Sequence, residues 1–239
     1  MEASTWRDAA SDLLLGGRCA GCDRPGRRLC SDCEAACVAV PVESWPDPTP
    51  PGLLDPTPVL PMTASRYEGR IRELIVSAKE HGRFGLVRPL GRLLSVPLEI
   101  VLRRLDLSSC VLVPMPSAPA AVRERGHDAV LGTARIAARR LRRRGHAVTV
   151  VAALRSARDV RDQAGLSARQ RAANLDGALR VAPALARGRA LRSPLVVVDD
   201  VITTGASAAE AVRALRAVGG RPVAVVTVAA TRRRTPHVG

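Results

Sequence analysis

The sequence predicts an α/β fold in which helices cover both faces of a parallel β-sheet, preceded by a small cysteine-rich module. Short, continuous apolar runs alternate with segments of helical period, as in sheets whose strands are buried on both faces. Four cysteines lie close together near the N-terminus, and a proline-rich stretch follows them. We therefore expect a module at residues 1–40, a linker at 41–61 and a main domain at 62–239.

The N-terminal region begins with a predicted helix. Trp6, Ala9 and Leu13 recur at helical spacing, and Gly16-Gly17 ends the pattern. Residues 41–61 then contain eight prolines. Such a density excludes a helix or a central strand, so the sequence predicts an extended linker. Loss of the module should accordingly leave the main domain folded.

Helices and strands alternate after the linker. We expect helices over residues 65–81, 86–105, 120–144 and 207–218, the second interrupted by Pro89 and Pro97. Continuous apolar runs predict buried strands at 111–113, 148–152, 195–198 and 223–228. Residues 155–174 are polar and have little periodicity, which suits a mobile loop that leads into a helix.

Composition excludes some classes of protein. No run approaches 18 apolar residues, which argues against a membrane span. Charged residues interrupt the N-terminal apolar pattern, so a signal peptide is not expected and the protein should be cytoplasmic. The formal charge is +15, but the chain uses arginine almost throughout, and the basic run 135–144 fits a solvated helix face. Lys79 is the only lysine: either its compact charge is required or it is a chance surface residue.

The cysteine cluster predicts a metal site. Cys19 and Cys22 form one C-x-x-C pair, Cys30 and Cys33 form another, and seven residues separate the pairs. Two such turns can complete a tetrahedral site of four thiolates, so we expect a structural Zn²⁺ in a zinc-ribbon-like module. Separate redox pairs are the alternative. A module this small buries little surface, so the metal should supply much of its folding energy.

The segment 195–207, LVVVDDVITTGAS, predicts a sugar-phosphate site. Asp199 and Asp200 follow four apolar strand residues, at the end of a strand where α/β sheets bind ligands. Two carboxylates there can accept hydrogen bonds from a vicinal diol or hold a cation. The residues that follow can form an anion site from hydroxyls, backbone amides and a helix N-terminus; they are Thr203, Thr204, Gly205, Ala206 and Ser207. An ordinary strand, turn and helix with capping side chains is the alternative.

This segment resembles the phosphoribosyl pyrophosphate signature of type I phosphoribosyltransferases. The resemblance implies a fold of that type, with Asp199 and Asp200 on the ribose hydroxyls and residues 203–207 on the 5-phosphate. It also implies Mg²⁺ with phosphoribosyl pyrophosphate, and a flexible loop over the site, for which 155–174 is the candidate. The strand before Pro114 and the residues after it resemble the family's pyrophosphate loop, with Met115, Pro116 and Ser117.

Further segments resemble the ComF family of competence-associated proteins. They are the four-cysteine module, Tyr67-x-Gly69-x-x-Arg72 followed by Lys79, VPMP at 113–116, RERGHD at 123–128 and QAGLSARQRAANLDGA at 163–178. Together they cover most of the chain in the expected order. The sequence departs from the family at 125–129, where the usual R-G-F-N-Q is replaced by RGHDA; His127 is either a substitute contact or a plain replacement.

Three functions are consistent with these features. The first is phosphoribosyl transfer, with Lys79, Arg155 or Arg158 stabilising the leaving pyrophosphate beside Mg²⁺; the sequence shows no general base and no acceptor. The second, which the ComF resemblance implies, is the handling of single-stranded DNA during uptake, with a helicase-like competence protein as partner. Net basicity fits such binding, but four aromatic residues offer little base stacking. The third is a regulatory protein that keeps the sugar-phosphate site without catalysis.

Overall fold

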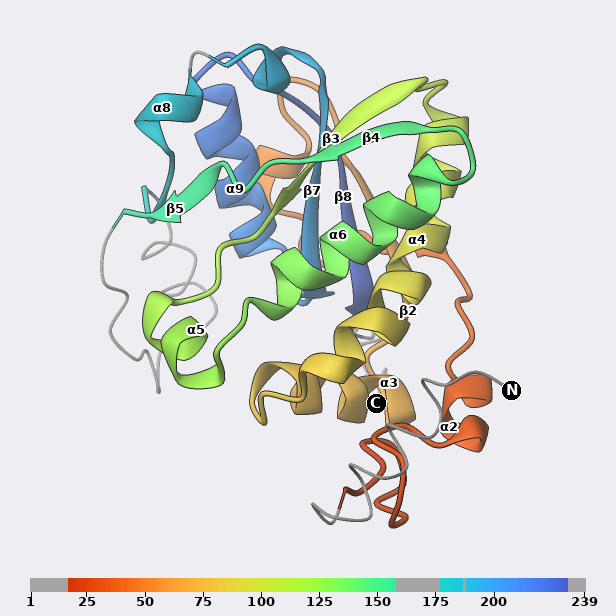
Figure 1. Cartoon of the computed structure of the whole chain (residues 1–239). Helices are drawn as coiled ribbons and strands as arrows, with labels where there is room; N and C mark the ends of the chain where they lie inside the picture. The colour runs from red at the N-terminus through yellow and green to blue at the C-terminus, as the bar shows by residue number, and fades with distance from the viewer. Residues whose placement is uncertain (1–16, 158–176, 187, 232–239) are drawn as a thin grey trace, which may run out of the picture.

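A six-stranded sheet forms the centre of the molecule. The structure, a computed structural model, describes residues 17–157, 177–186 and 188–231 (Figure 1). The strand order is β1-β2-β8-β7-β3-β4, and all neighbours are parallel except β1 and β2. This arrangement confirms the α/β fold with a mostly parallel sheet. The strands are β1 (Val42–Glu43), β2 (Leu60–Arg66), β3 (Ser109–Pro114), β4 (Ala147–Val150), β7 (Pro194–Ile202) and β8 (Arg221–Ala230).

Helices cover both faces of the sheet. One face packs against α3 (Gly69–Lys79), α4 (Val87–Arg104) and α6 (Ala129–Arg142), and the other packs against α9 (Ala206–Arg216) (Figure 1). Successive side chains of a strand point alternately to the two faces of the sheet. In β7, Val196 and Val198 belong to the core beneath α4 and α6, whereas Leu195 and Val197 belong to the core beneath α9. All four are fully buried, which explains why a continuous apolar run predicts the strand.

The proline-rich segment 41–61 is not the extended linker that its composition predicts. It adds β1 to the edge of the sheet, and its 3-10 turn (Pro51–Leu53) packs against α9. Leu53 is fully buried. The guanidinium of Arg216 in α9 donates to the carbonyl oxygen of Gly52 at 3.0 Å. The prolines do exclude an α-helix here, but the segment is buried against the main domain and forms hydrogen bonds with it.

Strand β2 replaces the end of the expected linker and the start of the expected helix. Its residues pair in parallel with β8, from Leu60 opposite Ala224 to Arg66 opposite Ala230. Helix α3 consequently begins at Gly69 rather than near residue 65. The sequence LPMTASR lacks both strand periodicity and a long apolar run, so the strand depends on hydrogen bonds supplied by β8 from a distant part of the chain.

Two helix predictions need correction. The helix expected over 120–144 consists of α5 (Pro119–Arg125) and α6, because Gly126 ends α5 in the left-handed region with φ +71°. Helix α4, in contrast, continues through Pro97. Pro89 lies in its first turn, where the missing N–H has no intrahelical partner to lose.

Three arginines of the basic run 135–144 are used by the fold, and one of them, Arg140, donates from Nε to Oγ of Ser95 in α4 at 3.3 Å. The guanidinium of Arg142 donates to the carbonyl oxygen of Val148 at 2.8 Å, and Arg144 forms an ion pair with Glu99 of α4. These contacts agree with a solvated helix face that is tied to its neighbours.

Smaller elements complete the fold. They are α2 (Ser31–Ala36), the 3-10 turn η2 (Phe84–Leu86), the antiparallel pair β5 (Leu154–Ser156) and β6 (Leu179–Val181), α8 (Pro183–Ala186) and the 3-10 turn η3 (Arg189–Arg192). The helix expected near Trp6 and most of the loop expected at 155–174 lie outside the described residues.

Candidate functional site

The acidic pair lies where β7 extends past its neighbour β3. Pairing between these strands ends at Val198, whereas pairing of β7 with β8 continues to Ile202. The chain after β3 turns away at this point, and the Met115 amide donates to the carbonyl oxygen of Val198 at 2.8 Å. Asp199 and Asp200 therefore lie within the strand rather than after it. They remain at the carboxyl edge of the sheet, where α/β proteins bind ligands.

Lys79 contacts this pair. It is the last residue of α3, and its Nζ lies 2.8 Å from Oδ2 of Asp200. Burial favours the neutral amine, but the attraction of Asp200 and its hydrogen bond outweigh burial and raise the pKa of Lys79. The only lysine of the chain is therefore held as a cation beside the predicted ribose-binding carboxylates.

Asp199 is in a different electrostatic position from Asp200. The ion pairs of the described residues do not include it, and one of its oxygens accepts the Asp200 amide at 2.8 Å. Burial raises the pKa of Asp199 well above its ordinary value, and the charge of Asp200 raises it further, although Lys79 opposes both. One carboxylate is thus compensated and the other is not. Hydroxyl donors of a diol, or a hydrated Mg²⁺, would supply what Asp199 lacks.

The turn after β7 requires glycine at residue 205 for two reasons. Gly205 precedes α9 with φ +72°, in the left-handed region that disfavours other residues. A Cβ at this position would also lie 2.6 Å from Cγ of Pro46. Pro46 of the proline-rich segment therefore packs directly against the predicted phosphate-binding turn.

The backbone amides of this turn are available to an anion. Hydrogen bonds among the described residues do not involve the amides of Thr204, Gly205, Ser207 or Ala208. The Ala206 amide has only a long contact, 3.5 Å to Oγ1 of Thr204. Unpaired amides at a helix N-terminus favour phosphate groups, since the helix dipole adds to their partial charge.

The predicted pyrophosphate loop lies beside the acids. Met115 lines a cavity of about 40 Å³ together with Asp199 and residues of the 203–207 turn. Oγ of Ser117 donates to Oδ1 of Asp128 at 3.0 Å, and Asp128 also caps α6. The segment 115–117 is therefore fixed between the end of β3 and the start of α6.

His127 packs against an aromatic neighbour. Its ring meets that of Phe84 edge-on, with centroids 5.1 Å apart and planes at 87°. Nδ1 lies 3.1 Å from the carbonyl oxygen of Arg125, and Nε2 is buried without a partner among the described residues. The described contacts place His127 between η2 and the turn that joins α5 to α6.

Arg155 and Arg158 are not brought to the acidic pair by any described contact. The Arg155 guanidinium donates to the carbonyl oxygens of Ala152 and Leu154, both at 2.9 Å. Arg158 lies outside the described residues. Among the three cations expected at the site, Lys79 is the one that the described part of the chain places on a carboxylate.

A cavity of about 550 Å³ adjoins the 203–207 turn. The carboxyl ends of β2, β7 and β8 bound it, and Thr203 and Thr204 belong to its wall. Residues 42–47 close another side. Sequence reasoning missed this wall because it interpreted the segment as a linker. Trp45, one of two tryptophans in the chain, was the signal that could have found it.

Neighbouring charges fix the orientation of Trp45. Its indole N–H donates to Oε2 of Glu43 at 3.0 Å, and Glu43 forms an ion pair with Arg104 of α4. Hydrogen bonds from Trp45 and Arg104 lower the pKa of Glu43. The carboxylate therefore stays ionised and holds the half-buried indole at the cavity wall.

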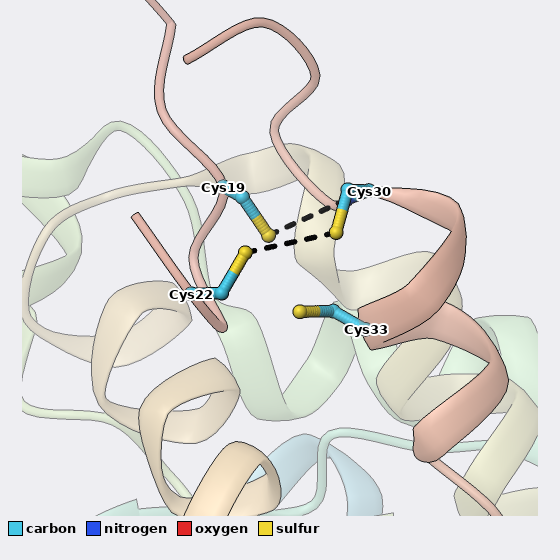
Figure 2. A group of neighbouring side chains, drawn as sticks. All are labelled: Cys19, Cys22, Cys30 and Cys33. Atoms are coloured by element: carbon cyan, nitrogen blue, oxygen red, sulfur yellow. Dashed lines mark hydrogen bonds between the residues drawn. The ribbon is translucent and has the colours of Figure 1, made fainter. Parts of the chain in front are cut away.

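The four cysteines of the predicted metal site come together (Figure 2). Their Sγ atoms all lie within 4.8 Å of one another, and those of Cys22 and Cys30 are 3.7 Å apart. Four Zn–S bonds of about 2.3 Å produce a tetrahedron with S···S edges of about 3.8 Å. Because both C-x-x-C pairs share one centre, the geometry favours one metal ion over two separate redox pairs.

The backbone favours a thiolate at Cys19. The amides of Cys30 and Gly21 donate to its Sγ at 3.3 and 3.4 Å. Burial opposes the charged form, but these hydrogen bonds outweigh it and lower the pKa of Cys19 to about 6. The thiolate is the form that binds metal.

The module docks on the main domain, contrary to the separation that a linker predicts. Arg70, in the first turn of α3, donates to Sγ of Cys33 and to the carbonyl oxygen of Gly21, both at 3.0 Å. Arg92 of α4 forms an ion pair with Glu34 of α2. The module therefore lies against the ends of α3 and α4 (Figure 1).

Comparison with known proteins adds no family to these observations. No protein-family model and no curated protein matches the sequence at a significant level. Every helix of the described residues falls short of the length or the apolar character needed to cross a membrane.

Proposed function

We propose that this chain binds a ribose 5-phosphate group, as phosphoribosyl pyrophosphate with Mg²⁺, and has the fold and chemistry of type I phosphoribosyltransferases of the ComF kind. One observation carries the proposal. A pair of carboxylates lies at the same edge of the sheet as a row of amides that, apart from the long contact of Ala206, have no hydrogen bond among the described residues, on consecutive parts of β7 and α9. These groups complement the hydroxyl and phosphate ends of one ribose 5-phosphate.

Each part of the proposed ligand has a partner in the chain. The ribose hydroxyls donate to Asp199 and Asp200, and the 5-phosphate accepts from the amides of the 203–207 turn. The pyrophosphate group lies toward 115–117. Asp199 and Asp200 would hold Mg²⁺ together with ligand oxygens, and the ion would supply positive charge beside the leaving group. Lys79 then acts by orienting Asp200, since its Nζ is already 2.8 Å from that carboxylate.

The cavity of about 550 Å³ offers room for a second ligand beside the sugar. In the proposed transfer, a nucleophile of that ligand forms a bond to C1 of the ribose while the bond from C1 to the pyrophosphate oxygen breaks. The nucleophile's proton leaves to solvent. A protein that only senses the sugar phosphate would need no such space, so the cavity favours the enzymatic form of the proposal.

Calorimetric titration with phosphoribosyl pyrophosphate and Mg²⁺ tests the site. The double substitution Asp199→Asn and Asp200→Asn should weaken binding at least a hundredfold, because two charge-assisted hydrogen-bond acceptors are lost. Asp106→Asn removes one negative charge from an exposed position with φ +49°, which asparagine tolerates, and should bind as the parent does. Unchanged affinity of the double variant would reject the site. Pyrophosphate release with candidate acceptors separates a transferase from a protein that only binds.

A further inference from the structure

We propose that residues 6–14 form a helix that packs, within the same chain, into an apolar groove between α4 and the chain that follows α2. The groove has a volume of about 210 Å³. Its residues take no part in the proposed sugar-phosphate site, so the two proposals stand or fall separately. The walls of the groove, the sequence of the segment and its attachment point support the docking.

Two apolar walls form the groove. Pro89, Leu93 and Val96 of α4 line one wall, and their spacing of four and three residues places them on one side of that helix. Cys37 and Ala39, from the chain between α2 and β1, line the other wall (Figure 1). An apolar groove beside a helix is a surface on which a second amphipathic helix can pack.

Helix α4 has apolar residues on its outer side as well as on the side that faces the sheet. Leu94 and Leu98 are fully buried in the core beneath the helix. On the outer side, Pro89 and Val96 are half-buried, and Ile100, one turn after Val96, is 37% exposed. A helix that is apolar on more than one side is expected to be covered on each of them. The outer side of α4 therefore suits a further packing partner.

The helix predicted near the N-terminus, which lies outside the described residues, has the matching pattern. Its apolar residues recur at helical spacing on one face, and they are Trp6, Ala9, Ala10, Leu13 and Leu14. A helix this short is marginal in water, so its apolar face requires a surface to pack against. From Trp6 to Leu14 this face is about 12 Å long, and the outer apolar side of α4 from Pro89 to Ile100 is about 16 Å long. The groove can therefore take the whole face.

The attachment of the segment brings it to this part of the molecule. The carbonyl oxygen of Arg18 accepts a hydrogen bond from the guanidinium of Arg83 at 2.9 Å, and α4 begins four residues after Arg83. Leu14 precedes Arg18 by four residues, so their Cα atoms can be no more than about 14 Å apart. This short tether gives the chain's own segment a high effective concentration at α4. It therefore favours that segment over the same segment of a second copy.

Charges beside the groove agree with this occupant. Arg92 lines the groove and forms an ion pair with Glu34, and the exposed Arg88 lies one turn before Arg92 on α4. The segment brings Asp8 and Asp12, one turn apart on the predicted helix. Exposed pairs of this kind contribute little free energy. The apolar face should therefore supply most of the stabilisation, and the charges should favour one orientation of the helix.

Tryptophan fluorescence tests the docking from the side of the segment. The substitution Trp45→Phe leaves Trp6 as the only tryptophan of the chain. In this background Trp6 should emit as a buried indole, and acrylamide should quench it weakly. Adding Leu13→Asp places a charge on the apolar face, and Trp6 should then emit as an indole in water and be quenched readily. Ser11→Asp adds the same charge between the apolar positions and should leave the emission unchanged.

Alkylation of Cys37 tests the docking from the side of the groove. This thiol is half-buried and lines the groove, so a docked helix should cover it. Iodoacetamide labelling of the full chain, assigned to Cys37 by mass spectrometry, distinguishes it from the cluster thiols. Leu13→Asp should speed the labelling of Cys37 roughly tenfold or more, because the covered state is lost. Ser11→Asp should label at the parental rate.

Three results would overturn the proposal. The first is a Trp6 emission typical of water in the protein with an intact segment, since the helix is then undocked. The second is equal labelling of Cys37 in Leu13→Asp and the parent, since the segment then does not cover the groove. The third is protection of Cys37 that is lost on dilution, together with a dimer mass by light scattering, since the segment then comes from a second copy.

Discussion

The cysteine cluster and the carboxyl edge of the sheet both gather groups that repel one another when charged, but they do so in different ways. The cluster takes four identical donors from residues 19–33, all around one centre. The sheet edge takes its groups from α3, from the end of β7 and from the turn that Pro46 covers. One cation of the right size can satisfy the first region. In the second, Lys79 compensates Asp200 and leaves Asp199 to a ligand.

This difference has an energetic meaning. A closed metal site stabilises the folded chain, because binding energy is folding energy when the unfolded chain has no site. An open site with an uncompensated carboxylate destabilises the folded chain as long as no ligand is bound. We therefore expect loss of a cluster thiolate and loss of the Asp199 carboxylate to have opposite effects on stability.

The largest effect should come from Cys19→Ser. Loss of one thiolate abolishes tight zinc binding, and the free energy of unfolding should fall by more than about 4 kcal/mol. Because Arg70 and Arg92 tie the module to α3 and α4, the main domain should lose stability as well. Elemental analysis and thermal unfolding measure both effects. Cys37→Ser, at a cysteine outside the cluster, is the control. A parental protein without zinc would contradict this prediction.

An intermediate effect is expected for Gly205→Ala. The new Cβ meets an unfavourable φ of +72° and a clash with Pro46, and together these should cost about 2–3 kcal/mol and weaken sugar-phosphate binding. Gly219→Ala has a similar φ, +76°, with nothing within 4 Å of the added Cβ, and should cost only about 1 kcal/mol. Chemical unfolding of both variants isolates the contact with Pro46. Equal losses would show that the proline-rich segment does not press on the turn.

The smallest effect, and the one of opposite sign, concerns Asp199→Asn. The pKa of Asp199 is raised in the folded protein. At pH values between the ordinary pKa and this raised pKa, the folded state therefore retains a proton that the unfolded state has released. Stability from this group is full below the ordinary aspartate pKa, about 4, and is lost as pH rises through the folded value. Asp199→Asn should therefore raise neutral-pH stability by about 1 kcal/mol and flatten its decline with pH.

Unfolding measured between pH 4.5 and 8 checks this expectation, with Asp106→Asn as the reference for loss of a remote charge. A variant that is less stable than its parent at neutral pH would show that Asp199 is compensated in the free protein. The contrast between the two regions would then disappear.

The same contrast separates what the sequence could predict from what it could not. The four-cysteine cluster was predictable because a C-x-x-C turn fixes the distance between its own thiols. The position of Asp199 next to the turn at Gly205 was predictable because strand, acids and turn are consecutive in the sequence. The contact of Lys79 with Asp200 depends on where α3 lies against the sheet, which no local pattern contains. Trp45 was missed because the prolines around it show which secondary structures the segment cannot form, but they do not show which part of the chain it packs against.

Helix α3 touches both regions. Arg70 in its first turn holds Cys33 of the cluster, and Lys79 at its last residue holds Asp200. Its 11 residues form a stiff rod about 16 Å long. A substitution of Cys33 would therefore remove a contact at one end of the helix whose other end holds the ammonium group beside Asp200.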